Sequence, residues 1–417
     1  MEQDKFTVID LFAGAGGLSE GFHRNGFKTV AYVEKDRYAC DTLRTRHTYW
    51  YLKEAGLEES YRQYLRGDMT REKYYSLMPV NPVINAQISG DTLGGVLNSV
   101  KRLKGSRNCE VDVLVGGPPC QAYSHIGRAR DPHRMRRDPR KFLYKHYVTL
   151  LKEFKPKVFV FENVPGILTA NRGLLFKEIC SEFDRAGYHV EYKLLNAADF
   201  MVLENRKRVI IIGWRKDYEM KYPAFNRINH DYFVENLLCD VPPLEPGEDL
   251  GVCDYLEKPS PYLVESGIRK DEDLLVHHQT RRVCERDREI YRIAIDLWNN
   301  EGERLRYPDL PENLKTHENE DSFLDRFKVV AKELHCSHTI VAHIAKDGHY
   351  FIHPDEEQIR SISVREAARI QSFPDNYFFE GPRTSRLTQI GNAVPPLMAE
   401  RIANEIKKML CNHHDKN

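Results

Sequence analysis

The feature that most constrains this chain is a series of short apolar runs, each followed by a distinctive turn. Five runs among the first 214 residues have the length of a strand: Thr7–Phe12, Lys28–Val33, Val111–Val115, Val158–Phe161 and Val209–Ile212. Helix-like segments lie between them, for example Tyr144–Glu153 and Leu174–Ala186. This alternation predicts an α/β fold, in which helices cover both faces of a largely parallel sheet.

Length and composition exclude several classes of protein. The chain has 417 residues, of which 41% are hydrophobic, and no apolar run approaches the ~18 residues that a membrane-spanning helix needs. The start, MEQDKF, lacks the basic-then-apolar order of a secretory signal. The nine cysteines form no CxxC pair, which excludes a zinc ribbon and suggests a reducing compartment. We therefore expect a cytoplasmic protein with no membrane segment.

Prolines and a change of charge after Trp214 predict three parts. Residues 1–214 hold 34 Lys and Arg against 25 Asp and Glu, residues 215–345 hold 18 against 27, and residues 346–417 hold ten of each. We predict a sheet domain in 1–214, a smaller and mostly irregular domain in 215–345, and a return segment in 346–417. The last helix, from Pro396 to about Leu410, should pack back on the first domain. The segment from His47 to Asn108 should add helices at one sheet edge.

A glycine-rich turn follows the first strand. Gly14, Gly16 and Gly17 would let the backbone approach a ligand closely. Glu34 closes the second strand, where a carboxylate can bind ribose hydroxyls. Because the turn lacks the GxGxxG spacing of dinucleotide-binding proteins, it is on its own compatible with a nucleoside cofactor or with a purely structural turn.

A second turn presents a cysteine. In DVLVGGPPCQAYS, Pro118 and Pro119 restrict the backbone so that Cys120 follows a buried strand on a rigid turn. A thiol at such a position is a candidate nucleophile. The following segment, Arg128–Lys145, carries eight Lys and Arg and two Asp, and positive charge favours both a thiolate and bound phosphates.

Four further blocks end or begin elements. VFVFENVPG places Glu162 at the carboxyl end of a core strand, where ligands bind in open α/β sheets and where burial can raise the pKa of an acid. Arg206 and Arg208 precede the next strand and could hold an anion or a carbonyl oxygen. SVREAARI begins with a capping box, and QIGNAVPP predicts a turn at Gly391–Asn392 before the last helix. Taken singly, a helix cap, a solvated basic edge and a loop junction are the ordinary alternatives.

Together and in this order, DLFAGAGG, GGPPCQAYS, ENV, ENRKR, SVREAARIQSFPDNY and QIGNAVPP resemble the motifs of the DNA (cytosine-5)-methyltransferase family, over roughly 280 of the 417 residues. The resemblance implies a Rossmann-like sheet that uses S-adenosylmethionine and releases S-adenosylhomocysteine. It also implies methylation of carbon 5 of a cytosine in a specific duplex DNA sequence.

The resemblance assigns the chemistry to a few residues. Cys120 would add to carbon 6 of the cytosine, and Glu162 would protonate the ring nitrogen next to the amino carbon, which makes carbon 6 electrophilic. Arg208, with Arg206, would bind the base carbonyl oxygen or support the Glu162 and Cys120 loops. Because carbon 5 is inaccessible in a stacked duplex, the base must be flipped out. Where the family usually has Gln, this chain has Glu204.

The cofactor pocket is implied in the same way. Its expected residues are Phe12, Gly14, Ala15, Gly17, Glu34, Pro118, Asn392 and Ala393. The family's usual Asp-Ile pair, which contacts the adenine, is absent. Either Gln87–Ile88, with Ile88 in the pocket, or Asp68 would take its place, and the sequence does not choose between them.

DNA contacts are expected from two regions. Next to the cysteine, the expected contacts are Gln121, Ser124 and Arg128. The resemblance implies that residues 215–345 are the target-recognition region, and there we expect contacts from Arg326 and Lys328, which lie among apolar residues. The alternating charges at 281–292 are instead typical of a solvated helix face. Five histidines between 335 and 353 with Cys336 have no regular metal-ligand spacing, so we expect no metal site.

Two other functions are compatible with parts of the sequence. A tRNA-methylating branch of the family is disfavoured by the roughly 130-residue middle region. A catalytically inactive DNA-binding partner is disfavoured by the intact Cys120, Glu162, Arg206 and Arg208. We expect a monomer in a bacterial cytoplasm, associated with the nucleoid through double-stranded DNA, with a cognate restriction or repair endonuclease as a possible partner.

Overall fold

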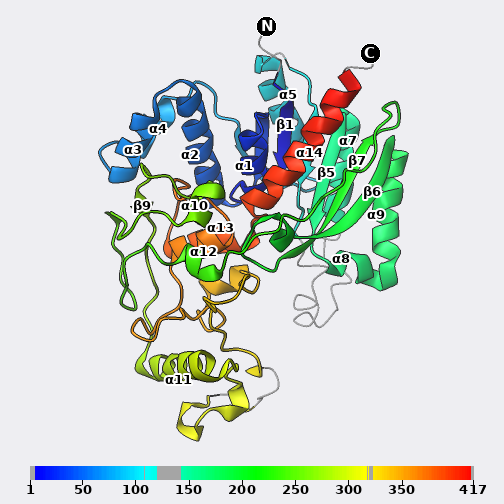
Figure 1. The fold of residues 1–417 in the computed structure, drawn as a ribbon. Helices are drawn as coiled ribbons and strands as arrows, with labels where there is room; N and C mark the ends of the chain where they lie inside the picture. Colours follow the sequence, from blue (N-terminus) through cyan, green and yellow to red (C-terminus); the bar gives the residue numbers. More distant parts are fainter. Residues whose placement is uncertain (1–4, 108, 120–141, 317, 319–322, 415–417) are drawn as a thin grey trace.

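The computed structural model (Figure 1) describes residues 5–107, 109–119, 142–316, 318 and 323–414. Its centre is a single seven-stranded sheet with the strand order β3-β2-β1-β4-β5-β7-β6. The strands are β1 (Thr7–Leu11), β2 (Lys28–Glu34), β3 (Val83–Asn85), β4 (Val113–Gly116), β5 (Val158–Asn163), β6 (Tyr188–Asn196) and β7 (Lys207–Arg215). Only β7 runs antiparallel to its neighbours, β5 and β6. The predicted α/β class is therefore confirmed.

Helices cover both faces of this sheet (Figure 1). One face carries α5 (Leu93–Arg107), α7 (Leu143–Phe154) and α9 (Leu174–Arg185), and the other carries α1 (Gly17–Arg24) and α14 (Pro396–His414). The helices predicted for the β3 edge are α2 (Arg37–Glu54), α3 (Glu58–Arg66) and α4 (Arg71–Ser76). A short helix, α8 (Gly166–Thr169), follows β5. Because α14 packs on α1, the end of the chain completes the layer that covers the first strand.

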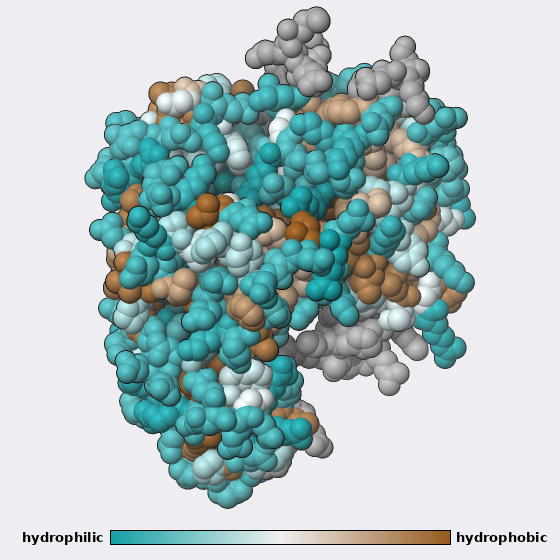
Figure 2. All heavy atoms as spheres, in the orientation of Figure 1, coloured by the Kyte–Doolittle hydropathy of each residue, from teal (hydrophilic) through white to brown (hydrophobic). Residues whose placement is uncertain are grey.

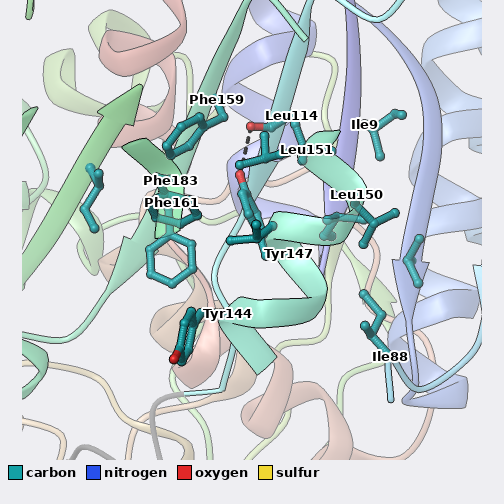
Figure 3. Packing of buried hydrophobic residues seen from close by; sticks show 14 of the residues in the cluster. Ile9, Ile88, Leu114, Tyr144, Tyr147, Leu150, Leu151, Phe159, Phe161 and Phe183 are labelled. Atoms are coloured by element: carbon teal, nitrogen blue, oxygen red, sulfur yellow. Dashed lines mark hydrogen bonds between the residues drawn. The ribbon is translucent and has the colours of Figure 1, made fainter. Parts of the chain in front are cut away.

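The core of the sheet explains why the central strands could be predicted from apolar runs in the sequence. All residues of β1 and β4 are buried, and so are all but one residue of β5. Figure 3 shows Tyr147 of α7 among Phe159, Phe161 and Phe183, with its hydroxyl donating to the Leu114 carbonyl at 3.0 Å. A strand buried on both faces must be apolar throughout, so its sequence is a continuous apolar run.

The sequence did not predict two strands, and both are sheet edges. The edge strand β3 has only three residues, all of them partly or fully exposed. At the other edge, β6 exposes Tyr192 and Leu194 and alternates them with Glu191 and Lys193. An edge strand lacks one neighbour and is reached by solvent, so its sequence does not form the continuous apolar run that marks a central strand.

After β7 the chain forms loops with mostly short elements and one longer helix, α11 (Glu285–Glu301). The shorter ones include η5 (Val234–Leu237), β8 (Val252–Cys253), α10 (Pro261–Glu265), β9 (Leu275–Val276), η9 (Ala342–Ala345), α12 (Val364–Ile370) and α13 (Arg383–Asn392). Around α11 the chain makes a lower lobe with its own hydrophobic cluster (Figure 1). Figure 2 shows that the visible surface of this lobe is mostly hydrophilic.

The return segment is more buried than its charges suggest. Every residue of α12 is buried, and the predicted capping box is present, with Ser363 and Glu366 bonding each other's backbone N–H. Arg369 lies between Asp240 and Asp375, so this helix joins the middle region to the end of the chain through a buried ion network. Among the helices of the described residues, none combines the length and apolar character needed to cross a bilayer.

Candidate active site

Three of the predicted turns lie side by side at one edge of the sheet. In the strand register, Leu11 of β1 pairs with Gly116 of β4, and Gly116 pairs with Phe161 of β5. The glycine turn, the GGPP turn and Glu162 therefore leave neighbouring parallel strands at their carboxyl ends. This is the edge at which open α/β sheets bind ligands.

Glu162 and Arg208 form an ion pair at this edge. Arg208 Nε lies 2.8 Å from Glu162 Oε1, and the two side chains are only 12% and 14% exposed. The neighbouring Gly117 leaves room for this carboxylate, since a Cβ there would lie 2.4 Å from Glu162 Oε2. The GGPP turn and the acid are thus packed against each other, and Arg208 fixes the acid from the antiparallel neighbour β7.

Asn163 ties the two turns together. It is 1% exposed, its Nδ2 donates to the Pro118 carbonyl at 3.2 Å, and its Oδ1 accepts from the Val164 N–H at 3.0 Å. Sequence reasoning gave Asn163 and Gly117 no role, although both stand directly beside predicted site residues. The predicted Cys120, Gln121, Ser124 and Arg128 lie outside the described residues.

The glycine turn has the backbone that its composition predicts. Phe12 and Gly14 have φ angles of 55° and 53°, and Gly16 has 82°. The Gly14 N–H donates to Glu34 Oε2 at 2.9 Å, so the turn and the end of β2 are joined directly. A Cβ on Gly17 would lie 2.1 Å from the Val394 carbonyl oxygen. The first and last predicted pocket motifs are therefore in close contact, and Gly17 is required by packing.

The two alternatives for the adenine contact lie in different parts of the fold. Residues 87–88 follow β3 at the carboxyl edge, where the Ala86 N–H donates to the Glu34 carbonyl at 2.8 Å. Gln87 is exposed, while Ile88 is buried in the core cluster of Figure 3. Asp68 instead follows α3, where its N–H donates to the Gln63 carbonyl. This geometry favours Gln87 and Ile88, which directly follow the residues that bond Glu34, over Asp68.

The two arginines of the ENRKR block have different surroundings. Unlike Arg208, Arg206 is completely buried and donates to the carbonyls of Ile340, Gly391 and Ala393 at 2.7, 3.1 and 2.8 Å. These bonds tie Arg206 to the backbone of two other segments. Because its side chain is completely buried, it has no exposed surface for a base.

The predicted turn at Gly391–Asn392 was wrong. Both residues belong to the last turn of α13, and the chain leaves the helix only at Ala393. Gly391 lies against the backbone of Val341 and Ala342, so close that a Cβ on it would lie 2.3 Å from the Ala342 nitrogen. Glycine at position 391 therefore serves close packing of the helix against another segment and does not mark a turn. Asn392 is exposed and Ala393 is buried beside Gly17.

The predicted DNA contacts of the middle region lie in the lower lobe. Arg326 is 3.8 Å from Asp347 and stacks over Phe323, and Lys328 pairs with Asp325 at 2.5 Å. Both side chains are mostly buried around the lobe's own hydrophobic cluster. Both cations are thus paired with acids inside the lobe, whose hydrophobic cluster is separate from the clusters that cover the sheet.

The histidines of this region serve as hydrogen-bond partners. His338 bonds the Tyr350 carbonyl, His343 bonds Asp347 at 3.0 Å, and His349 bonds the Tyr291 hydroxyl at 3.1 Å. Burial lowers the pKa of His338 and of His349 to about 4. In the part of the chain that the structure describes, no three His, Cys, Asp or Glu side chains gather as metal ligands would.

Comparison with known proteins identifies the class to which this fold and site belong. The chain is a member of the C-5 cytosine-specific DNA methylase family, whose model matches residues 6–60 and 96–408. It is a DNA (cytosine-5)-methyltransferase. Residues 61–95, which include α4 and β3, fall outside the match.

Individual relatives cover nearly the whole chain. It is 44% identical to the type II methyltransferase M.Bpa9945I of Bacillus paralicheniformis, over 98% of this chain and 100% of the relative. It is 31% identical to the type II methyltransferase M1.HphI of Haemophilus parahaemolyticus, over 97% and 88% of the two chains. A prophage-encoded protein of E. coli, described as a DNA modification methyltransferase, has the same fold, with a TM-score of 0.63 and 21% identity over 98% and 100% of the chains.

Proposed function

We propose that this enzyme transfers the methyl group of S-adenosylmethionine to carbon 5 of a flipped-out cytosine in a specific duplex DNA sequence, through a covalent adduct with Cys120. The observation that carries the proposal is the arrangement at the carboxyl edge of the sheet. There Glu162 is clamped by Arg208 and packed against the GGPP turn that leads into Cys120.

The residue types fit the chemistry. The Cys120 thiolate adds to carbon 6 while Glu162 donates a proton to the ring nitrogen next to the carbon that bears the amino group, and the ring becomes an enamine with a nucleophilic carbon 5. Carbon 5 then takes the sulfonium methyl. When its proton leaves to water, the bond from carbon 6 to sulfur breaks, Cys120 departs as thiolate, and the ring nitrogen returns its proton to Glu162. Arg208 holds the Glu162 carboxyl in place and can also bind the base carbonyl oxygen.

The residues at the edge also fit the cofactor. Glu34 offers a half-exposed carboxylate at the end of β2 for ribose hydroxyls, and Gln87 offers an amide beside it for an adenine edge. The glycine turn brings backbone close to the same place, Phe12 leads into it, and Ala393, the residue after Asn392, lies against Gly17. When bound there, S-adenosylmethionine supplies the electrophilic methyl group.

The remaining proposals concern partners and organisation. Residues 1–214 would form the catalytic domain, 215–345 the target-recognition domain and 346–417 the return segment. Because relatives are named type II methyltransferases, a cognate endonuclease is the partner that we propose, for a monomer acting on DNA in the bacterial cytoplasm. The basic segment after Cys120 is the expected path of the phosphate backbone.

One assay tests the reaction. Purified protein is incubated with tritium-labelled S-adenosylmethionine and either duplex DNA or tRNA, and labelled DNA is expected. Label in tRNA but not in DNA would overturn the proposed substrate. If neither is labelled while DNA is still bound, the inactive-partner alternative holds.

A second experiment tests the covalent step. Duplex DNA with 5-fluorocytosine at the target should trap the protein, because fluorine at carbon 5 cannot leave as the proton does. Cys120→Ala should abolish both trapping and transfer while binding of S-adenosylhomocysteine survives. The matched control, Cys284→Ala at an exposed cysteine, should behave as wild type. Turnover in the Cys120 variant would refute the thiolate mechanism.

A further inference from the structure

Three distant segments of the chain meet around one buried acid. The lead-in to β7 pairs with the end of the middle region, where the Ser337 N–H donates to the Leu203 carbonyl and the Asn205 N–H donates to the Ser337 carbonyl, both at 2.9 Å. The turn between α13 and α14 packs on the same spot through Arg206. We call this meeting point of residues 203–206, 337–340 and 391–393 the Glu204 junction.

Arg206 holds the third segment through its backbone. Its Nη2 donates to the carbonyls of Gly391 and Ala393, which lie on either side of Asn392, while its Nη1 donates to the Ile340 carbonyl. Carbonyl oxygens carry only partial charge, so the full charge of this buried guanidinium calls for a carboxylate nearby. Glu204 Oε1 is 3.6 Å from Arg206 Nη1 and is the acid paired with it.

Glu204 is itself completely buried. Its Oε1 accepts from the Ile340 N–H at 2.6 Å, whereas its Oε2 has no hydrogen-bond partner among the described residues. Burial raises the pKa of Glu204 to about 7, although Arg206 opposes this increase. Both the charged and the neutral form are therefore populated near neutral pH. The Gln that the family usually has at this position would carry no such charge.

We propose that Glu204 is a positioning residue for the cofactor pocket, whose carboxylate orients Arg206 and thereby fixes the backbone on both sides of Asn392. The inference rests on the proposed function in one respect, namely that Asn392 lines the cofactor pocket. Ionised Glu204 holds the guanidinium by charge as well as by contact. Neutral Glu204 keeps the bond from the Ile340 N–H and loses the attraction to Arg206.

Other groups face Glu204 from the elements that surround it. Arg206 and Arg208 face it from its own segment and β7, and both favour its charged form. Cys336 faces it from the middle region. Burial is the main cause that raises the pKa of this thiol, and the charge of Glu204 raises it further. His338 also belongs to the junction, but its ring bonds the Tyr350 carbonyl, and burial lowers its pKa to about 4, below the pH range of the experiment. A change in the junction between pH 5.5 and 8.5 is therefore expected to follow Glu204.

Binding of S-adenosylhomocysteine, measured by isothermal titration calorimetry, tests the inference without turnover. The variant Glu204→Gln keeps the size and the acceptor for the Ile340 N–H and removes the charge. Its Kd divided by the wild-type Kd should be about one at pH 5.5 and about five at pH 8.5, since a charge-assisted contact is roughly twice as strong as a neutral one, and the extra ~1 kcal/mol corresponds to about fivefold in an equilibrium constant. The same ratio at both pH values would overturn the inference, because a merely structural role does not depend on the charge.

A control and a second measurement make the result unambiguous. Glu54→Gln makes the same change at an exposed acid paired with Lys5, and its ratio should stay near one at both pH values. Hydrogen exchange of residues 389–394 should be faster in Glu204→Gln than in wild type at pH 8.5 and equal at pH 5.5. If wild type binds no S-adenosylhomocysteine, the proposed function fails, and the exchange measurement alone decides the inference, with equal exchange at both pH values refuting it.

Discussion

Replacing Asn163 by Ala should loosen the turn that leads into Cys120 and slow methyl transfer. The substitution removes the donor to the Pro118 carbonyl and the acceptor for the Val164 N–H. Pro118 is buried and Val164 is half-buried, so one of the two backbone groups loses its partner with no water to replace it. A buried unsatisfied polar group costs about 1–3 kcal/mol, and we therefore expect a loss of about 2 kcal/mol in the free energy of unfolding.

The catalytic effect should be larger than the effect on stability suggests. Pro118 stands two residues before Cys120, and a displacement of about 1 Å at a reacting group can lower the rate about 100-fold. This corresponds to roughly 2.7 kcal/mol in the activation barrier. We expect kcat for methyl transfer to fall by about that factor, with a smaller change in the Kd of S-adenosylhomocysteine, because Glu34 and Gly14 do not depend on Asn163.

Urea unfolding and tritium transfer kinetics measure the two effects, and two further variants calibrate them. Asn163→Asp keeps an acceptor for the Val164 N–H but sets a carboxylate oxygen against the Pro118 carbonyl, so it should also lose activity. Asn299→Ala removes the same kind of bond, to the Pro354 carbonyl at 3.4 Å in the lower lobe, and should leave kcat unchanged. If Asn163→Ala keeps kcat within twofold of wild type, the turn is not held by this side chain and the reasoning is refuted.

Three further predictions concern stability. Burial raises the pKa of Asp10 to about 7, so the contribution of this residue to the free energy of unfolding is lost as pH rises. In urea unfolding, the stability of Asp10→Asn relative to wild type should therefore increase by about 3 kcal/mol from pH 5 to pH 8. A stability difference that does not change with pH would contradict this. Gly21→Ala places a Cβ 2.3 Å from the Ala399 carbonyl carbon and should destabilise by about 1–3 kcal/mol, whereas Gly95→Ala, with open space around it, should not. Arg369→Met removes the cation that joins two buried carboxylates, leaving Asp240 to Arg269 and Asp375 to the more distant Arg365. It should cost about 3–5 kcal/mol or prevent folding, and a loss below about 1 kcal/mol in urea unfolding would show that the network is dispensable.

Local sequence was sufficient for the central strands and for the order of the site motifs. Central strands are buried on both faces, so their residues must be apolar whatever the rest of the chain does. The capping box of α12 was equally readable, because its two bonds join residues three apart. The edge strands β3 and β6 escaped detection because their burial depends on a single neighbouring strand.

The roles of the paired motifs were decided by tertiary structure. Arg206 and Arg208 stand two residues apart and look equivalent in the sequence, yet one is buried against Gly391 and Ala393 and the other reaches Glu162. Likewise, the helix through Asn392 depends on how closely Gly391 approaches the backbone of Val341 and Ala342, some 50 residues earlier. The sequence by itself therefore determined the central strands and the order of the motifs along the chain. Only the folded chain decided which of them face the substrate edge, because that depends on contacts between segments that are distant in sequence.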